Sequence, residues 1–355
     1  MILGKDKSKF PSGNALFIDC KDKKILIDTN PGAERIAEFL ESELEIQLSD
    51  ITDIILSHAH LDHARGLSSI FEQSNAKIYG HPDTLERCEK KVRVGLYAGI
   101  PKQDISHFEA FGSSLDFKDR NYPHSHKIDL TDGQKLVFND INLIAHETNA
   151  HCLHMLDYEI SDGEYRILLS CDYDFTPVPW YGVPQRGKAV TSFKSATKRL
   201  VERKADYIIS SHRTMPISMN DQREELNQYL QLITNRTKKA IKRVPSSGSI
   251  KLKEMKDFVY PISKMEGHYS KDYQICAQAW DYWILLAHLE DAWRIGEVKC
   301  IDPDGDTFLK LCIEKGRYLP NKVDELLVDG WADKTLQERM LYPLPLNSVW
   351  KRTVN

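Results

Sequence analysis

Three histidines and one aspartate fall within six consecutive residues of this sequence. The segment reads His58-Ala59-His60-Leu61-Asp62-His63. His58 and His60 are two residues apart, so in an extended segment both imidazoles point to the same side and can reach one ion. Neutral imidazole and carboxylate are the ligands that suit zinc and similar divalent metals. A solvated loop with chance histidines is the ordinary alternative, but four such residues in six favour a metal site.

The neighbouring elements predict how this segment is held. An apolar run at 53–57 leads directly into it and predicts a short buried strand. Similar runs at 141–144, 166–170 and 206–210 are also followed closely by His or Asp. Because loops after strands are where binding sites are built, we expect these polar residues to gather at one edge of the fold.

The N-terminal part alternates strands and helices. Runs at 14–19 and 24–28 predict a β-hairpin, and apolar residues at helical spacing predict a helix over 33–44. This alternation predicts an α/β layered fold. The looser, aromatic-rich segment at about 88–127 predicts a lid or insertion, because long stretches without a pattern are often functional in compact domains.

The C-terminal part has a different character. It is helical from about residue 222, with five basic residues among the eight of 236–243 and one apolar stripe over 275–293. A turn at 302–306 between the runs 297–301 and 307–311 predicts a β-hairpin. We therefore predict a catalytic domain over 1–221 and a helical, winged-helix-like extension with a tail over 222–355.

The composition excludes several classes of protein. Of the 355 residues, 41% are hydrophobic and 28% are charged, which excludes disordered and fibrous chains. The net charge of −4 gives no general attraction to nucleic acid or anionic lipid. No apolar run approaches the length of a signal core or a membrane span, and the seven cysteines include no CxxC pair. We expect a cytoplasmic protein with reduced thiols and no contact with membranes.

The HxHxDH spacing of residues 58–63 resembles the signature of the metallo-β-lactamase superfamily. This resemblance implies a four-layer αββα sandwich with further metal ligands on three later loops. His151 matches the histidine of the first of these loops, with His146 and His154 as rival candidates. The Pro-Gly that usually precedes that histidine is replaced by Asn149-Ala150, so the backbone of this loop must differ.

The other two loops also match the family's order. Asp172 matches the aspartate that bridges two metals, and it follows Cys171, where the family often has glycine. His212 matches the last metal-binding histidine. The early loop at 28–32 resembles the family's Asp-Thr-Gly loop, and Asp28 is expected to accept a hydrogen bond from a ligand histidine.

The resemblance implies a dinuclear centre for two divalent ions, with zinc expected and iron or manganese as alternatives. A hydroxide between the two metals would attack a carbonyl or phosphoryl centre. Asp62 and Asp172 are the catalytic candidates, because one carboxylate orients the nucleophile and the other helps to protonate the leaving group. The implied ligands are His58, His60 and His151 for the first ion, Asp62, His63 and His212 for the second, and Asp172 for both.

The substrate side is less defined by the sequence. Tyr97, Trp180 and Tyr181 are candidates to line a substrate pocket, with core packing as an equal alternative. The region 222–312 resembles the winged-helix module of one branch of the superfamily, which includes glyoxalase II-like hydrolases, acyl-thioesterases and a single-strand endoribonuclease. Such a module has three possible roles, namely binding nucleic acid, covering the active-site mouth and forming a homodimer.

Three functions follow from these patterns. The first is a hydrolase of a small ester, thioester or lactone. The second is an endoribonuclease for single-stranded RNA, with the basic run 236–243 as its track. The third is a mononuclear iron oxygenase of sulfur compounds that uses His58, His151 and Asp172 as a facial triad. The acidic net charge favours a small-molecule substrate over RNA, and the complete second set of ligands weighs against the mononuclear enzyme.

Overall fold

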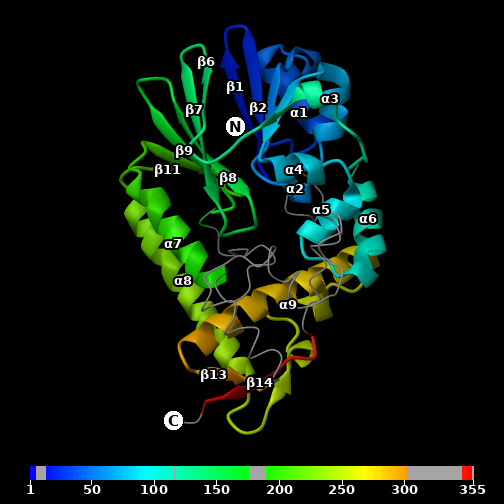
Figure 1. The fold of residues 1–355 in the computed structure, drawn as a ribbon, viewed down its shortest axis with the longest axis vertical. Coiled ribbons are helices and arrows are strands. Elements are labelled where there is room, and N and C mark those ends of the chain that lie inside the picture. Colours follow the sequence, from blue (N-terminus) through cyan, green and yellow to red (C-terminus); the bar gives the residue numbers. More distant parts are fainter. Residues whose placement is uncertain (5–12, 116, 174, 176–188, 302–345, 354–355) are drawn as a thin grey trace.

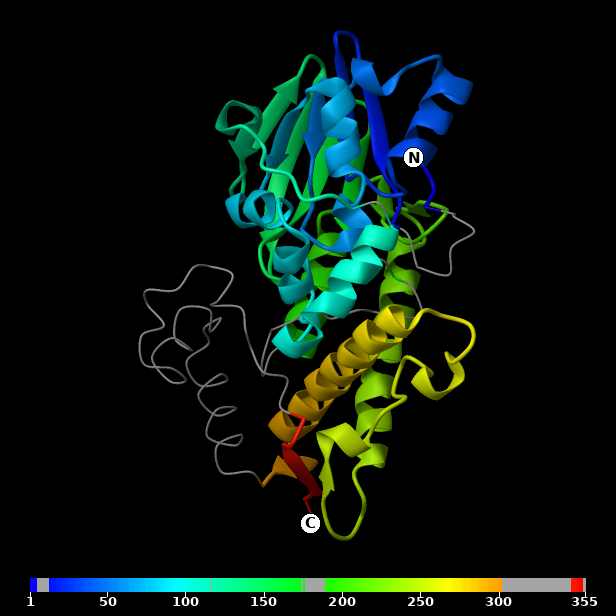
Figure 2. The ribbon, with the colours of Figure 1, turned by 90° about the vertical axis from the view of Figure 1, so that its right-hand side faces the viewer.

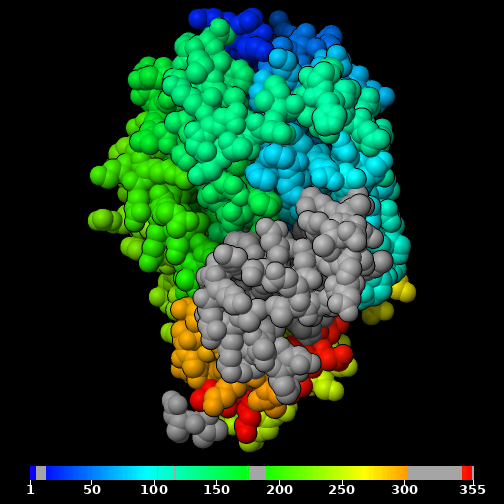
Figure 3. Space-filling model, in the orientation of Figure 1, coloured from blue at the N-terminus to red at the C-terminus, as the bar shows by residue number. Residues whose placement is uncertain are grey.

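The computed structural model describes residues 1–4, 13–115, 117–173, 175, 189–301 and 346–353. Two β-sheets lie at one end of the long axis and the C-terminal helices at the other (Figure 1). Helices α1 (Ala33–Leu44) and α3 (Leu67–Ser74) lie outside the first sheet, and α7 (Ala189–Glu202) lies outside the second. In the space-filling view the first part of the chain, blue to cyan, lies beside the green second sheet (Figure 3). The predicted four-layer α/β arrangement is confirmed.

The first sheet has the strand order β1-β2-β3-β4-β5. The hairpin β1–β2 is antiparallel, as predicted, and β2, β3, β4 and β5 run parallel to one another. Its central strands are buried on both faces, which explains their continuous apolar runs. The strands are Leu16–Cys20, Lys23–Ile27, Asp53–Ile55, Lys77–Gly80 and Lys127–Asp129.

The second sheet has the strand order β11-β10-β9-β8-β7-β6. Among the described strands of this sheet, β9 and β10 pair in parallel, and the other neighbours are antiparallel. Since β7, β9 and β10 all run in one direction, the loops that follow them meet at the same edge of the sheet. The strands, from β6 to β11, are Lys135–Phe138, Ile141–Thr148, Met155–Ser161, Arg166–Cys171, Tyr207–Ser210 and Ile217–Ser218.

The segment predicted as a lid or insertion forms two helices in the structure. Helices α5 (Lys91–Tyr97) and α6 (Ile105–Ser114) pack on each other, and α6 packs on α9 (Lys271–Arg294) (Figure 2). The indole N–H groups of Trp280 and Trp283 donate to the carbonyl oxygens of Ala98 and Gly99 at 3.0 and 2.8 Å. These bonds tie the turn after α5 to the C-terminal part of the chain.

Two long helices and a small sheet make up the described C-terminal region. Helix α8 (Gln222–Arg243) packs against α9, and the side chain of Asp281 in α9 accepts the N–H groups of residues 258–260. The small sheet has the order β12-β14-β13, with strands Ile250–Lys251, Val349–Arg352 and Val298–Cys300. The partner of β13 is thus β14, and the predicted hairpin arm at 307–311 lies outside the described residues. The winged-helix interpretation stays a prediction.

The remaining helices are short. Among the helices in the described ranges, none is long and apolar enough to cross a membrane. The short α-helices are α2 (Leu61–Ala64) and α4 (Pro82–Arg87), and the 3-10 turns are η1 (Leu48–Asp50), η2 (Lys102–Asp104), η3 (His124–His126), η4 (Leu252–Glu254) and η5 (Ile262–Lys264).

Candidate metal centre

The HxHxDH segment begins shortly after β3 and ends inside α2. His60 is the residue before this helix, with an extended backbone (φ −73°, ψ 151°), so the chain changes from strand-like to helical within the motif. The backbone N–H of His63 donates to the carbonyl oxygen of His60 at 3.0 Å. This change of direction places His58 and His60 in one group and Asp62 and His63 in another.

Three histidines form the first group of donors. His58 Nε2 and His151 Nε2 each lie 2.9 Å from His60 Nδ1, and all three side chains are buried. On a tetrahedral zinc ion the ligand nitrogens are about 3.3 Å apart, so only a small spreading is needed around one ion. Burial lowers the pKa of His58 and His60 well below the ordinary imidazole value, which favours the neutral form that binds metals.

Two carboxylates and two histidines form the second group. His63 Nε2 lies 3.0 Å from Asp172 Oδ1, and His212 Nε2 lies 3.5 Å from Asp62 Oδ2 and 3.6 Å from Asp172 Oδ1. These are oxygen and nitrogen donors within reach of a single divalent ion. His212 comes from the loop after β10, and it is the least buried of the histidines in the two groups.

Asp172 lies between the two groups. Its Oδ2 is 3.1 Å from His151 Nε2, whereas its Oδ1 faces His63 and His212. Burial raises the pKa of Asp172, but the surrounding imidazoles of His63, His151 and His212 outweigh that effect and hold it well below the usual carboxyl range. One carboxylate therefore offers an oxygen to each group.

Cys171 precedes Asp172, at a position where glycine is common in the family that this sequence resembles. Its backbone conformation explains that preference. Cys171 has φ +49°, in the left-handed region that favours glycine. The pairing of β9 with β10 also shifts its register at this point, where Ser210 pairs with Cys171. The irregularity ends the strand and places the carboxylate of Asp172 between the two histidine groups.

Asp28 contacts the second group through the Nδ1 atom of His63. Its carboxylate accepts hydrogen bonds from the N–H and hydroxyl of Ser57 at 2.8 and 2.7 Å and pairs with His63 Nδ1 at 2.9 Å. Burial opposes a charge on His63, but the carboxylates of Asp172 and Asp28 raise its pKa well above the ordinary value. The predicted hydrogen bond between Asp28 and a histidine of the motif is therefore present, and it fixes the orientation of the ring.

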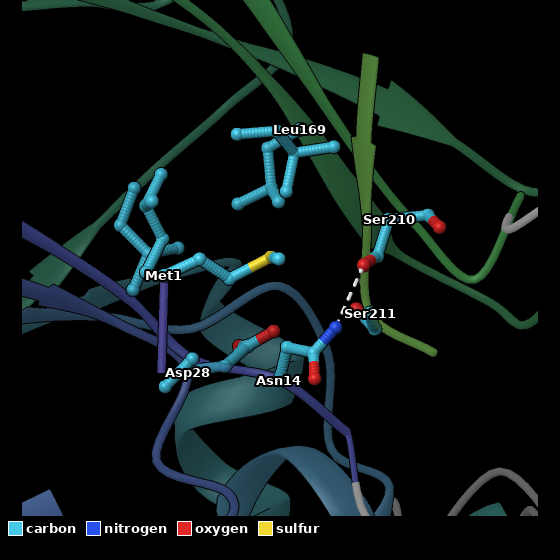
Figure 4. A pocket seen from close by; sticks show the side chains of 10 residues that line it. Met1, Asn14, Asp28, Leu169, Ser210 and Ser211 are labelled. Atoms are coloured by element: carbon cyan, nitrogen blue, oxygen red, sulfur yellow. Dashed lines mark hydrogen bonds between the residues drawn. The ribbon is translucent and has the colours of Figure 1, made fainter. Parts of the chain in front are cut away.

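Asn14 anchors the loop that carries His212. Its amide donates to the carbonyl oxygens of Ser210 and Arg213 at 3.2 and 2.6 Å, and its backbone N–H donates to Ser211. Figure 4 shows this side chain beside Asp28 and Ser210 in a small cavity between the two sheets. Asn14 thus fixes the loop that carries the last candidate ligand, His212.

Tyr97 is fully buried beside the first group. Its ring lies 5.1 Å from that of His60, and its hydroxyl donates to the carbonyl oxygen of Leu153 at 2.6 Å. The sequence predicted that Tyr97 lines the substrate pocket, whereas its buried position beside His60 favours support of the candidate metal ligands. The other two candidates for the pocket, Trp180 and Tyr181, lie outside the described residues.

The rival histidines lie elsewhere. His146 Nε2 is 3.7 Å from Glu159, on the second sheet. His154 pairs with Glu147 at 2.9 Å and stacks on His81, with ring centroids 4.3 Å apart and an angle of 9° between the planes. One ion cannot lie in the planes of two parallel stacked rings, so His81, Glu147 and His154 as they stand form a hydrogen-bonded stack and not a metal site.

One donor near the centre was not predicted from the sequence. Cys152 is buried next to His151, and its sulfur belongs to the first group, within 4.8 Å of the donor nitrogens. Its position beside a candidate ligand was the only signal, and a buried thiol is also an ordinary core residue.

The donor set fits a pair of divalent ions. Five imidazoles and two carboxylates converge in two groups that share Asp172, and residues 9–212 match the family described as the metallo-beta-lactamase superfamily. The match covers more than half of the chain, and the chain belongs to this superfamily. A metal-dependent hydrolase is the class of enzyme that this superfamily and this donor set indicate.

Particular relatives are more distant. An exodeoxyribonuclease (YycJ) of Bacillus anthracis is 27% identical over 81 residues, which are 23% of this chain and 30% of the relative. An atrochrysone carboxyl ACP thioesterase of Pseudocercospora fijiensis is 25% identical over 152 residues, 42% of this chain and 43% of the relative. These matches span less than half of the length of either relative.

A solved structure extends the likeness in fold. A metallo-beta-lactamase family protein of Thermus thermophilus aligns with a TM-score of 0.58 and 20% identity, over 82% of this chain and 91% of that one. At this identity the likeness concerns the fold alone. The structural alignment covers more of this chain than the superfamily match does. Part of the fold of the C-terminal region is therefore shared with the Thermus thermophilus protein as well.

Proposed function

We propose that this protein is a dinuclear-metal hydrolase of a small ester, thioester or lactone. The observation that carries the proposal is the position of Asp172, whose two carboxylate oxygens face two different groups of donors. A mononuclear oxygenase would use one group of three ligands and would have no use for Asp62, His63 and His212 around a second position.

Each residue has a role in this proposal. His58, His60 and His151 hold the first ion, and the second group holds the other, with Asp172 shared. Two such ions, when bound, supply a water of lowered pKa and polarise the oxygen under attack. Asp62, which is partly exposed, would orient the attacking water, and Asp172 or a metal-bound water would supply the proton for the leaving group.

The contacts of two cations in the basic run 236–243 favour a small acyl substrate over nucleic acid. Lys239 donates to the carbonyl oxygen of Phe258, and Arg243 donates to the carbonyl oxygens of Lys256 and Asp257. These two cations hold a neighbouring loop and are not presented as a free track for phosphates. The thioesterase among the relatives supports an acyl substrate by analogy, whereas the exodeoxyribonuclease keeps a nuclease as the second candidate.

Two measurements test the proposal. Elemental analysis of the purified protein is expected to find about two zinc ions per chain, and one iron per chain would favour the oxygenase. The same preparation is then assayed against an aryl ester, an acyl thioester, a lactone and labelled single-stranded RNA and DNA. Hydrolysis of an acyl substrate with no cleavage of nucleic acid supports the proposal, and the reverse pattern overturns it in favour of the nuclease.

A further inference from the structure

Cys152 brings a sulfur atom to the first group of histidines. Its side chain is fully buried, and its Sγ, together with one nitrogen each of His58, His60 and His151, forms a group whose members all lie within 4.8 Å of one another. Around a tetrahedral zinc ion, sulfur and nitrogen ligands are about 3.5 Å apart. The side chain therefore needs to move by only about 1 Å to bring its sulfur to an ion that is held by these histidines and by the shared Asp172.

Tyr97 holds this sulfur beside the histidines. Its hydroxyl lies 2.8 Å from Cys152 Sγ and 2.6 Å from the carbonyl oxygen of Leu153. The single proton of this hydroxyl can be donated to either acceptor, and donation to the sulfur stabilises the thiolate form. The ring of Tyr97 meanwhile packs against His60 at 5.1 Å. Cys152 is thus held by a residue that also contacts the donor cluster.

The charges of the site favour an anionic fourth donor. The imidazoles of the first group are neutral ligands, and Asp62 and Asp172 are the carboxylates among the grouped donors. Two divalent ions bring four positive charges, which exceed the negative charges of these two carboxylates and of the buried Asp28 behind His63. A thiolate reduces the excess, and it is the ligand that zinc and cobalt bind more strongly than manganese does.

We propose that Cys152 is a further protein ligand of the metal held by His58, His60 and His151, with Tyr97 as the residue that positions its sulfur. Binding forms a metal–sulfur bond and releases the thiol proton to solvent. The inference rests on the metal centre of the proposed function, but it does not depend on which bond the enzyme hydrolyses.

Cobalt substitution tests the proposal without an activity assay. Metal-free protein is loaded with Co²⁺, and the near-ultraviolet absorption is recorded for a thiolate-to-cobalt charge-transfer band. We expect the band in the natural protein and its loss in Cys152→Ser and Cys152→Ala. Cys88→Ser is the matched control, because Cys88 is equally buried but lies outside the donor groups, and this variant keeps the band. Zinc affinity is expected to fall on the order of 10–100-fold in Cys152→Ser.

Several outcomes overturn the inference. A cobalt-loaded natural protein without the band, or a band that survives in both Cys152 variants, excludes sulfur ligation by Cys152. A band lost in Cys171→Ser instead assigns the sulfur to the other cysteine near the centre. If the band behaves as expected while esters, thioesters and lactones are not cleaved, only the substrate proposal fails. A protein that binds no cobalt overturns both proposals.

Discussion

Asp172 is the residue on which the two-metal interpretation depends most directly. Asp172→Asn keeps the shape of the side chain but removes its charge and one of the two oxygens that face the donor groups. We expect the metal content to fall from about two ions per chain to about one, and the hydrolytic rate to fall on the order of 10²–10⁴-fold. Metal analysis and steady-state kinetics on one preparation check both values.

The control for this variant is Asp162→Asn. Asp162 lies in the exposed turn between β8 and β9 and accepts hydrogen bonds from the N–H groups of Glu164 and Tyr165. An asparagine oxygen can accept the same bonds, so we expect metal content and rate to stay unchanged. If Asp172→Asn behaves like this control, the bridging role of Asp172 is wrong.

Single residues differ in how well the sequence could predict them. The HxHxDH motif is local, and the order of the later loops pointed to His151, Asp172 and His212, which the structure brings together with it. The contact of Tyr97 with Cys152 and His60 could not be predicted, because it joins residues far apart in the sequence through packing alone. A buried tyrosine and a pocket tyrosine have the same appearance in a sequence.

At the scale of elements, one glycine lets a helix approach the metal-binding loops. A Cβ on Gly66, just before α3, would lie 2.4 Å from the carbonyl oxygen of Thr29. The hydroxyl of Thr29 in turn donates to the carbonyl oxygen of His63 at 3.0 Å. Any shift that makes room for a side chain at Gly66 therefore reaches the second donor group.

Gly66→Ala is expected to lower the free energy of unfolding by about 1–3 kcal/mol, because the added methyl group meets backbone that cannot yield cheaply. It should also weaken zinc binding at the second group. The matched control is Gly112→Ala in α6, where the nearest atom to a Cβ is 3.6 Å away and alanine favours the helix. Urea unfolding and a zinc competition assay measure both effects, and equal stability of the two variants contradicts the expected crowding.

The elements themselves were predicted unevenly. The N-terminal hairpin and the helix over 33–44 follow local periodicity and agree with β1, β2 and α1 within two residues at the ends. The long helix α9 was predicted as one apolar stripe, yet it is buried almost all round because α6, α7, α8 and the small sheet surround it. The partner of β13 lies beyond the nearest apolar run, so a local pattern could not identify β14.

At the scale of the whole molecule, His288 gives stability a defined pH dependence. Burial in α9, together with Arg236 and Lys194, holds the pKa of His288 well below its ordinary value, and Thr237 lies 2.9 Å from its Nδ1. In the unfolded chain this imidazole titrates at about pH 6.5. Below that pH the unfolded state binds a proton that the folded state does not. Each unit by which the pH is lowered below about 6.5 therefore reduces the free energy of unfolding by about 1.4 kcal/mol through this residue.

His288→Gln removes the titration while keeping a polar group near Thr237. We expect the slope of stability against pH to decrease by about 1.4 kcal/mol per pH unit once the pH is below about 6.5, and to be unchanged well above that value. Both proteins are compared in the same metal-loaded state, so that the histidines of the donor groups add equally to both slopes and the difference reports on His288. Equal slopes for the variant and the natural protein would show that His288 is protonated in the folded state.

Removal of metal is expected to destabilise the folded chain as a whole. The donor groups combine loops from both sheets, and the unfolded chain does not hold them together. At a free zinc concentration about 100 times the Kd, one bound ion adds about 2.7 kcal/mol to the free energy of unfolding. Chelation should lower Tm and a return of zinc should restore it; a Tm indifferent to chelation would mean that the donor groups do not bind zinc in the folded protein.

The hydrogen bonds from Trp280 and Trp283 to residues 98 and 99 affect the order in which the centre can form during synthesis. The ribosome releases the chain from its N-terminus, so all the candidate ligands, with Cys152 included and His212 the last, emerge before either tryptophan. At about 5–20 residues per second, several seconds pass before α9 can dock beside Tyr97. A nascent chain in that interval has its metal donors, but α9 does not yet hold the turn that follows Tyr97. We therefore expect the final metal geometry to form only after α9 has been made.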